Sequence, residues 1–269
     1  MKISIAQMDV RLAEPAYNFA RAEEMIRQAA AGGADVVLIP ETFNTGFFPK
    51  ENLASYCDRD GAEVKRRMGA LAAELKINIV AGSVANVKPD GGIYNSAYVF
   101  DRQGECIAQY DKTHLFSPSG EHEYFKAGDK LCTFQLDGHP CGLIICYDIR
   151  FLELVRTLAL TGLDVLFVPA EWPGLRRYHW QTLTSARAIE NQMFVAACNS
   201  CSKDTGCGGT SRILDPWGEV LAEADDSEQI ISADLDFSVI EGIRRSINVY
   251  RDRRPELYDV RKRAAQITE

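Results

Sequence analysis

The chain of 269 residues lacks several features that would place it in a specialised class of protein. No apolar run approaches the ~18 residues needed to cross a membrane. Positive charge does not dominate, because the formal net charge is −8, whereas a nucleic-acid surface needs a basic patch. The first residues include no long apolar segment with a small-residue cleavage site, so no signal peptide is expected. These absences favour a globular protein of the cytoplasm.

Cysteine is present, but not in a disulfide or metal pattern. The eight cysteines have scattered spacings, which is typical of reduced thiols in a cytosolic protein. Cys198 and Cys201 form one CxxC pair, but no second CxxC or paired histidines accompany it. We therefore expect these two residues to pack in the interior, and we expect neither a metal nor a cofactor.

Short apolar runs alternate with helical patterns along the chain. Residues 35–40 (DVVLIP) are apolar at every position after Asp35, which is typical of a strand covered on both faces. Residues 77–85 predict a further strand. Helices are expected over residues 15–31, 61–75, 151–161, 178–191 and 236–246. No Ser/Gly linker or change in composition divides the sequence. It therefore predicts a single α/β domain over 1–269, with mixed sheets in layers and helices outside.

Three polar side chains stand where predicted strands end. Glu41 follows VVLIP, Lys112 follows AQYD, and Cys146 follows LII. Strand ends form the usual site crevice of α/β sheets, and partial burial there lets neighbouring charges set protonation. Each residue also has an ordinary explanation, namely packing for the thiol and solvent exposure for the two charges. Their positions alone do not separate a site from a coincidence.

Six blocks of sequence resemble those of the nitrilase superfamily of carbon–nitrogen hydrolases, in the same order. They are PETFNTGF (40–47), YDKTHLF (110–116), GLIICYDIRF (142–151), FVPAEWP (167–173), ARAIENQMFVAACN (186–199) and DPWGEVLAEA (215–224). One departure is Leu152, where the family usually has proline, and we expect it to affect only the following helix. The resemblance implies a four-layer α-β-β-α sandwich of two mixed sheets with helices outside.

The same resemblance implies a thiol-dependent amidohydrolase with a Glu41, Lys112 and Cys146 triad. Cys146 would form a thioester that water then hydrolyses, with Glu41 as general base. Lys112 and the backbone N–H of Tyr147 would stabilise the oxyanion. A free thiol titrates near about 8.5, and we expect the dipole of a helix starting at 148–151 to favour the thiolate.

A second glutamate is expected to support the lysine. In the family it lies in the segment after the lysine, and Glu121 is preferred to Glu123 because it stands seven residues before the glycine of AGD. A papain-like Cys–His pair using His114 is the rival mechanism. No papain-type sequence surrounds Cys146, so we expect a structural role for His114.

The blocks EWP (171–173), HW (179–180) and ARAIENQ (186–192) look like those of bacterial ω-amidases. These enzymes hydrolyse the terminal amide of 2-oxoglutaramate or 2-oxosuccinamate. Arg150 is the predicted partner of the substrate carboxylate, with a structural ion pair as an equal alternative. Trp172 and Phe47 are predicted apolar walls. The alternative functions are an N-carbamoyl amine or amino-acid amidohydrolase, an aliphatic amidase, or a non-catalytic binding or assembly protein.

The last part of the chain is rich in arginine with acidic residues interleaved, which favours a solvated or subunit-contacting tail over a nucleic-acid arm. The resemblance implies that a tail of about 247–269 contacts a partner subunit and that the helices at 151–161 and 178–191 form a dimer face. A homodimer or higher homo-oligomer is expected.

Overall fold

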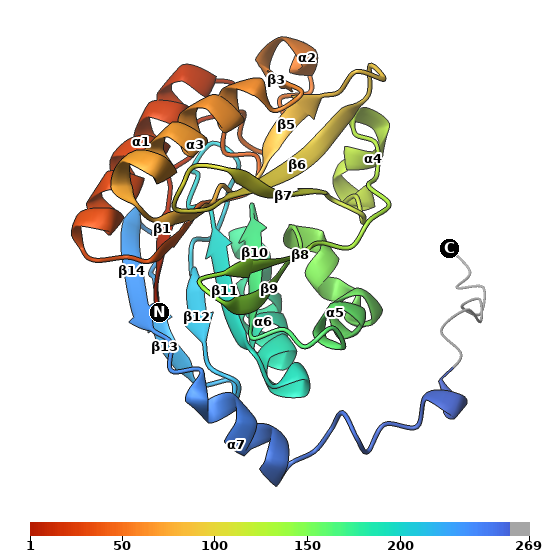
Figure 1. Cartoon of the computed structure of the whole chain (residues 1–269). Coiled ribbons are helices and arrows are strands. Elements are labelled where there is room, and N and C mark those ends of the chain that lie inside the picture. Colours follow the sequence, from red (N-terminus) through yellow and green to blue (C-terminus); the bar gives the residue numbers. More distant parts are fainter. Residues whose placement is uncertain (259–269) are drawn as a thin grey trace.

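Two mixed β-sheets form the centre of the computed structural model, which describes residues 1–258 (Figure 1). In order across the first sheet, its strands are β14 (Gln229–Asp234), β1 (Lys2–Gln7), β2 (Val36–Leu38), β4 (Asn78–Val80), β6 (Ile93–Phe100), β5 (Val84–Val87) and β3 (Asp58–Arg59), and β7 (Cys106–Asp111) also pairs with β6. Those of the second sheet are β13 (Val220–Glu223), β12 (Arg212–Leu214), β11 (Phe194–Asn199), β10 (Val165–Ala170), β9 (His139–Leu143) and β8 (Thr133–Leu136). Parallel pairs such as β1–β2 and β10–β11 occur beside antiparallel pairs such as β6–β7.

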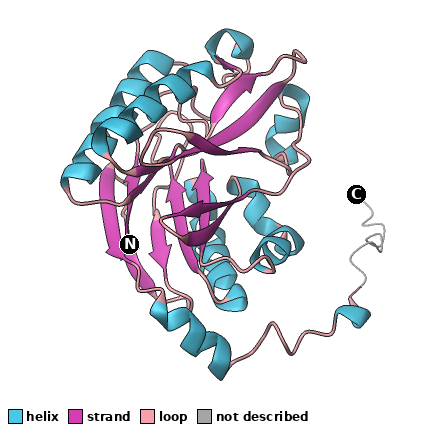
Figure 2. Ribbon diagram, viewed as in Figure 1, coloured by secondary structure: helices cyan, strands magenta, loops and turns pink. Residues whose placement is uncertain are grey.

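Helices cover the outer faces of both sheets. Figure 2 shows them on either side of the strands, with α1 (Pro15–Ala31) and α3 (Ala62–Leu75) over the first sheet and α5 (Leu152–Ala159) and α6 (Arg177–Asn191) over the second. The other described helices are α2 (Leu53–Tyr56), α4 (Glu121–Tyr124), α7 (Ser238–Ser246) and the 3₁₀ turns η1 (Ser117–Ser119), η2 (Cys146–Arg150), η3 (Gly174–Arg176) and η4 (Pro255–Leu257). The predicted four-layer sandwich is confirmed. Among the described helices, none is long and apolar enough to cross a membrane.

Alternating side chains of the central strands build two separate cores. Ile3 and Ile5 of β1 point into the core between the sheets, whereas Ala6 joins the core beneath α1 and α3. In the neighbouring strand β2, Leu38 points into the core between the sheets, and Val37 points into the core beneath α1 and α3. Successive side chains of a strand face opposite sides, so a strand covered on both faces must be apolar throughout, as predicted for residues 35–40.

The strand predicted over residues 77–85 is wrong in one respect, because two strands share this stretch. β4 pairs with β2, and β5 pairs with β6 on the far side. Gly82 makes the turn between them with φ +50°, and a Cβ there would lie 1.8 Å from the carbonyl oxygen of Pro40. Only glycine fits such an approach, and the approach fixes the backbone immediately before Glu41.

The predicted helices agree with the structure to within two residues at each end. α5 begins at Leu152, so the leucine that replaces the family's proline still starts the helix. Beyond α7 the chain continues as an extended segment that includes η4 (Figure 1). This segment contacts the body, because Tyr250 packs against the core and donates its hydroxyl to the carbonyl oxygen of Asn191. Residues 259–269 of the tail predicted at about 247–269 lie outside the described residues.

Candidate active site

The three predicted residues come from both sheets and lie buried together. Glu41 follows β2 and Lys112 follows β7, both in the first sheet. Cys146 opens η2, shortly after β9 of the second sheet. The lysine and the glutamate are fully buried and the cysteine is 6% exposed. All three residues therefore lie just beyond the ends of strands, as the sequence predicted.

Two carboxylates hold the Lys112 ammonium. Its Nζ donates to Glu41 Oε1 at 2.8 Å and to Glu121 Oε2 at 2.9 Å. Glu121 opens α4 and is buried, whereas Glu123 is exposed, so the structure brings the preferred glutamate to the lysine. Asn95 of β6, which sequence reasoning missed, donates its Nδ2 to Glu41 Oε1 at 2.8 Å.

The second carboxylate oxygen of Glu41 faces the other sheet. Oε2 accepts the backbone N–H of Glu171, the residue directly after β10, at 2.8 Å. Glu41 is thus fixed from both sheets, with one oxygen held by Lys112 and Asn95 and the other by the backbone of the second sheet. A carboxylate restrained in this way is positioned in advance to accept a proton from a neighbouring group.

Burial and neighbouring charges set the protonation of Lys112 and of Cys146. Burial alone lowers the pKa of Lys112, but Glu121 and Glu41 outweigh it and raise that pKa well above the ordinary value. Burial raises the pKa of the Cys146 thiol well above its usual range, and Glu41 adds to this, while Lys112 only partly opposes it. The helix expected to start at 148–151 is instead the turn η2, followed by α5 from Leu152. η2 starts at Cys146 itself, and the thiol needs a base.

The backbone at Cys146 is strained. Its φ is +46°, a left-handed conformation that costs a non-glycine residue on the order of 1–3 kcal/mol. This sharp turn from β9 into η2 presents the thiol at the end of the strand. Within residues 1–258 the next backbone N–H, that of Tyr147, has no acceptor. Because Tyr147 lines the pocket beside Cys146, this N–H is free to donate to a ligand there.

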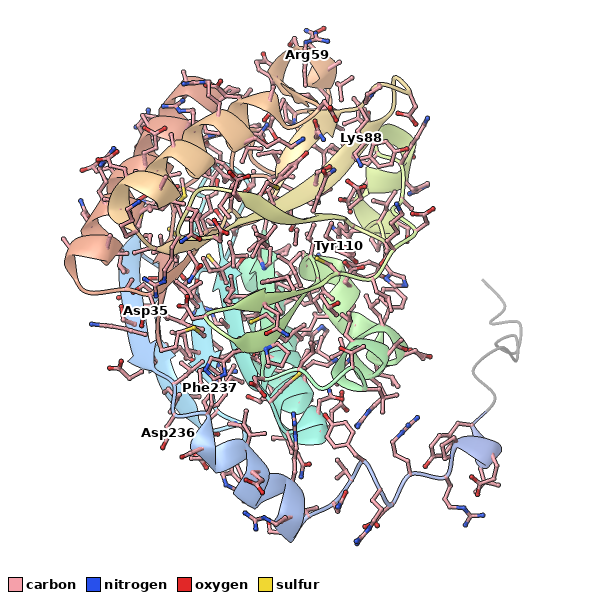
Figure 3. All side chains as sticks on the ribbon, in the orientation of Figure 1. Asp35, Arg59, Lys88, Tyr110, Asp236 and Phe237 are labelled. Atoms are coloured by element: carbon pink, nitrogen blue, oxygen red, sulfur yellow. The ribbon has the colours of Figure 1, made fainter. Side chains whose placement is uncertain are left out.

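Asp148 is a structural anchor that sequence reasoning missed, although it stands two residues after the cysteine in the CYD block. It is fully buried. Tyr110 of β7, labelled in Figure 3, donates its hydroxyl to Oδ2 at 2.8 Å. The backbone N–H of Ile145 donates to Oδ2 at 3.0 Å and that of His114 to Oδ1 at 2.9 Å. One carboxylate therefore ties the cysteine turn to the segment that carries Lys112.

His114 belongs to this anchor. Its Nδ1 lies 2.8 Å from Asp148 Oδ1 and its ring stacks on Phe151 with centroids 3.6 Å apart. Among the described residues no hydrogen bond joins it to the Cys146 thiol. This arrangement supports a structural role and gives no support to a Cys–His pair.

We expect Asp148→Asn to lower the free energy of unfolding by about 3 kcal/mol, because an amide NH₂ would face donors and leave several of them unpaired in the interior. Tyr110→Phe removes only one of these donors and should cost about 1 kcal/mol. Urea unfolding followed by circular dichroism measures both. Equal stability of the two variants would contradict the anchoring role of Asp148.

A small pocket adjoins Cys146, which is one of its lining residues. Its walls include Phe47 and Trp172, as predicted, together with Phe116 and Pro173, and Glu171 lies beside the thiol in the lining. Within residues 1–258 no group of three or more His, Cys, Asp or Glu side chains is arranged to hold a metal ion.

Two half-buried arginines line the same pocket. Arg150 lies over the Trp172 ring at 4.7 Å from its centroid, and Arg176, which sequence reasoning missed, lies over Phe116 at 5.2 Å. Within the described chain neither forms an ion pair. Burial lowers the pKa of Arg150, and the neighbouring Arg176 contributes to this shift. The two guanidinium groups therefore lie close enough to repel and both lack an acidic partner among these residues.

Comparison with known proteins identifies the family. The family model described as carbon-nitrogen hydrolase matches residues 2–245. A Bacillus subtilis protein named 2-oxoglutaramate amidase is 42% identical over 95% of this chain and 98% of its own length. The structure of Saccharomyces cerevisiae Nit3, a member of branch 10 of the nitrilase superfamily, has a TM-score of 0.83 at 29% identity, covering 94% of this chain and 96% of Nit3.

A variant of an amidase from Nesterenkonia sp. AN1 has a TM-score of 0.84 at 27% identity, over 96% of this chain and 95% of that one. Its structure shows the acetamide moiety of fluoroacetamide covalently added at the active-site cysteine. The fold, the matched length and the residue identity agree across these proteins. The chain therefore belongs to the carbon–nitrogen hydrolase family, within the nitrilase superfamily.

Proposed function

We propose that this enzyme hydrolyses the terminal amide of a short ω-amido 2-oxo acid, of the 2-oxoglutaramate or 2-oxosuccinamate type, and releases ammonia. The carrying observation is that Arg150 and Arg176 line the pocket of Cys146 without an acidic partner among the described residues. A substrate carboxylate would supply that partner, since guanidinium groups bind carboxylates through paired hydrogen bonds. The name of the Bacillus subtilis relative supports the same substrate class.

In the first half-reaction Glu41 takes the thiol proton as the Cys146 sulfur attacks the amide carbon. The carbonyl oxygen becomes an oxyanion that faces the Lys112 ammonium and the backbone N–H of Tyr147. The protonated Glu41 then gives its proton to the amide nitrogen. The C–N bond breaks, ammonia leaves, and a thioester remains on Cys146.

In the second half-reaction water attacks the thioester carbon while Glu41 takes a proton from it. The same donors hold the second oxyanion. Its collapse breaks the C–S bond, and the departing thiolate takes the proton from Glu41. Lys112 remains a cation throughout, because Glu41 and Glu121 hold its pKa high against the effect of burial. Glu121 and Asn95 act as positioning residues that keep the ammonium and the base in place.

The direct test is a substrate panel of 2-oxo-acid amides, aliphatic amides, N-carbamoyl compounds and nitriles, read by ammonia release and product mass. We expect the 2-oxo-acid amides to give the highest kcat/KM. Turnover of N-carbamoyl amines without ammonia release from 2-oxoglutaramate would replace this proposal with the carbamoyl amidohydrolase.

Arg150→Gln should lower kcat/KM for an ω-amido 2-oxo acid by about 10–100-fold, since a charge-assisted hydrogen bond contributes about 1.5–3 kcal/mol. The loss should appear mainly in KM, because the carboxylate is bound in ground state and transition state alike. Arg176→Gln should act in the same direction. An uncharged aliphatic amide of similar length is the control, and its kcat/KM should change by less than about threefold. Equal losses on both substrates would assign the arginines to structure.

We further propose that residues 1–269 act as one domain in a cytoplasmic homodimer. Large apolar side chains are exposed on α5, on α6 and along the described part of the tail, as Leu152, Ile189 and Leu257 show. Their burial against a second copy would remove an apolar surface from water. The eight free thiols fit a reducing compartment.

A further inference from the structure

Glu171 is a buried acid that the proposed mechanism uses only through its backbone. It is 2% exposed, yet neither carboxylate oxygen has a hydrogen-bond partner in the described chain. The buried Thr42 Oγ1 lies beside this carboxyl group and interacts with it, but the two groups do not meet the geometry of a hydrogen bond. Buried polar side chains are nearly always hydrogen-bonded, and leaving one unpaired costs free energy. Because Glu171 lines the pocket of Cys146, a ligand in that pocket is the natural missing partner.

The backbone contacts of Glu171 place it on one side of the reacting carbon. Its N–H donates to Glu41 Oε2 at 2.8 Å and also faces the Cys146 sulfur. The oxyanion side is taken by Lys112 and the Tyr147 N–H. Glu41, which must reach the departing nitrogen, lies next to Glu171. The side chain of Glu171 therefore adjoins the position of the amide nitrogen rather than that of the carbonyl oxygen.

We propose that the Glu171 side chain accepts an N–H of the substrate's primary amide and so makes the enzyme select –CONH₂ over groups without that hydrogen. This inference rests on the proposed amide hydrolysis and adds a specificity-determining residue to it. An ester of the same acid presents no N–H at this position, so it gains nothing from Glu171. A primary amide carries two such hydrogens, one for Glu41 and one for Glu171.

The surroundings of Glu171 favour the uncharged carboxylic acid. The titratable groups that face it from neighbouring segments are Glu41, Lys112, Cys146 and Cys207. Burial raises the pKa of Glu171 well above its usual range and Glu41 raises it further, while Lys112 and the contact with Thr42 only partly oppose them. A neutral acid offers an O–H to Thr42 Oγ1 and keeps its carbonyl oxygen for the substrate N–H, which would satisfy every unpaired atom of this cluster.

The test compares an amide with the methyl ester of the same acid in Glu171→Leu. Removing one hydrogen bond from the reacting amide should lower its kcat/KM on the order of 10–100-fold, with less than about threefold change for the ester. Glu171→Gln keeps an acceptor oxygen and should recover most of the lost amide-to-ester ratio. Glu123→Leu, on the exposed side of α4, is the matched control. Equal losses for amide and ester in Glu171→Leu would overturn the proposal.

Stability gives a second readout that does not need Glu171→Leu to fold. In the unfolded chain a glutamic acid loses its proton at about pH 4.3, whereas the folded group, with its raised pKa, keeps the proton to higher pH. The stability of the wild type therefore falls as pH rises from the unfolded pKa to the folded one. Glu171→Gln cannot ionise, and its Tm should exceed that of the wild type near pH ~8 and equal it near pH ~4. A lower Tm at both pH values would show a carboxylate held by protein contacts and overturn the proposal.

The activity of the wild-type enzyme on the substrate panel tests the proposed substrate class separately from the role of Glu171. If the enzyme ignores ω-amido 2-oxo acids, that substrate class is wrong, and the amide-to-ester ratio is then measured on the amide that the panel selects. If 2-oxo-acid amides are hydrolysed but the ratio does not change in Glu171→Leu, the substrate class stands and the role of Glu171 falls.

Discussion

Replacing Cys146 with alanine is expected to lower the rate of amide hydrolysis by about 10⁴-fold or more. Both half-reactions of the proposed mechanism need this sulfur, because the first forms a thioester on it and the second hydrolyses that thioester. The fold should survive, since alanine fills the same buried position with fewer atoms and the pocket beside it is already open to a ligand. Ammonia release at high enzyme concentration measures the loss. Intact-mass spectrometry with a slow substrate should detect an acyl-enzyme in the wild type and none in the variant.

Cys106→Ala provides the matched control, because this exposed thiol on β7 lies outside the pocket. It should retain wild-type activity and the acyl-enzyme signal. Full activity of Cys146→Ala would contradict the thioester mechanism. It would also contradict the assignment of this pocket as the active site of a thiol-dependent hydrolase.

Replacing Lys112 with methionine should reduce both activity and stability. The ammonium is one of two proposed oxyanion donors, and losing such a donor costs about 10²–10³ in kcat. The change also leaves Glu41 and Glu121 as neighbouring buried carboxylates without their cation. Breaking a buried ion pair by removing one partner costs about 3–5 kcal/mol, so the free energy of unfolding should fall by that amount.

The pH dependence of this loss follows from the lysine and from the two carboxylates that it leaves behind. Its pKa is raised in the folded state, so its contribution is fully present below the pKa of an unfolded lysine, about 10.4, and is lost only as pH rises through the folded value. The lysine therefore adds no pH dependence below about pH 9, but in the variant Glu41 and Glu121 can avoid burying two negative charges only by binding protons. The destabilisation should therefore grow as pH rises from acidic to neutral values. Lys126→Met, which breaks an exposed pair with Asp90, should leave the free energy of unfolding nearly unchanged, because water and salt screen exposed ion pairs. Wild-type stability of Lys112→Met would contradict the buried network.

The sequence predicted those parts of the molecule that follow from local pattern. Continuous apolar runs located the strands, and the residues directly after them, Glu41, Lys112 and Cys146, meet because strand ends of layered sheets converge. Glu121 required the family resemblance, since α4 is a single short turn whose place depends on the surrounding fold. The walls Phe47 and Trp172 were likewise found from the blocks they stand in.

The residues that sequence reasoning missed depend on tertiary register. Asn95 lies within β6, and which face it presents depends on how that strand pairs with its neighbours. Arg176 belongs to η3, an irregular turn whose course no periodicity indicates. A fully buried, unpaired Glu171 contradicts the usual distribution of glutamate, so pattern alone gave no reason to expect it in the pocket.

Glu41 receives its hydrogen bonds from both sheets, and this has a consequence for how activity appears during folding. Residues 41, 112, 146 and 171 are distant in the chain and meet only when the two sheets have docked, which is a late event for contacts of large sequence separation. Until then Cys146 has no base beside it. A chain that has formed only one sheet carries an ordinary protonated thiol, so the reactive centre is absent from incompletely folded molecules.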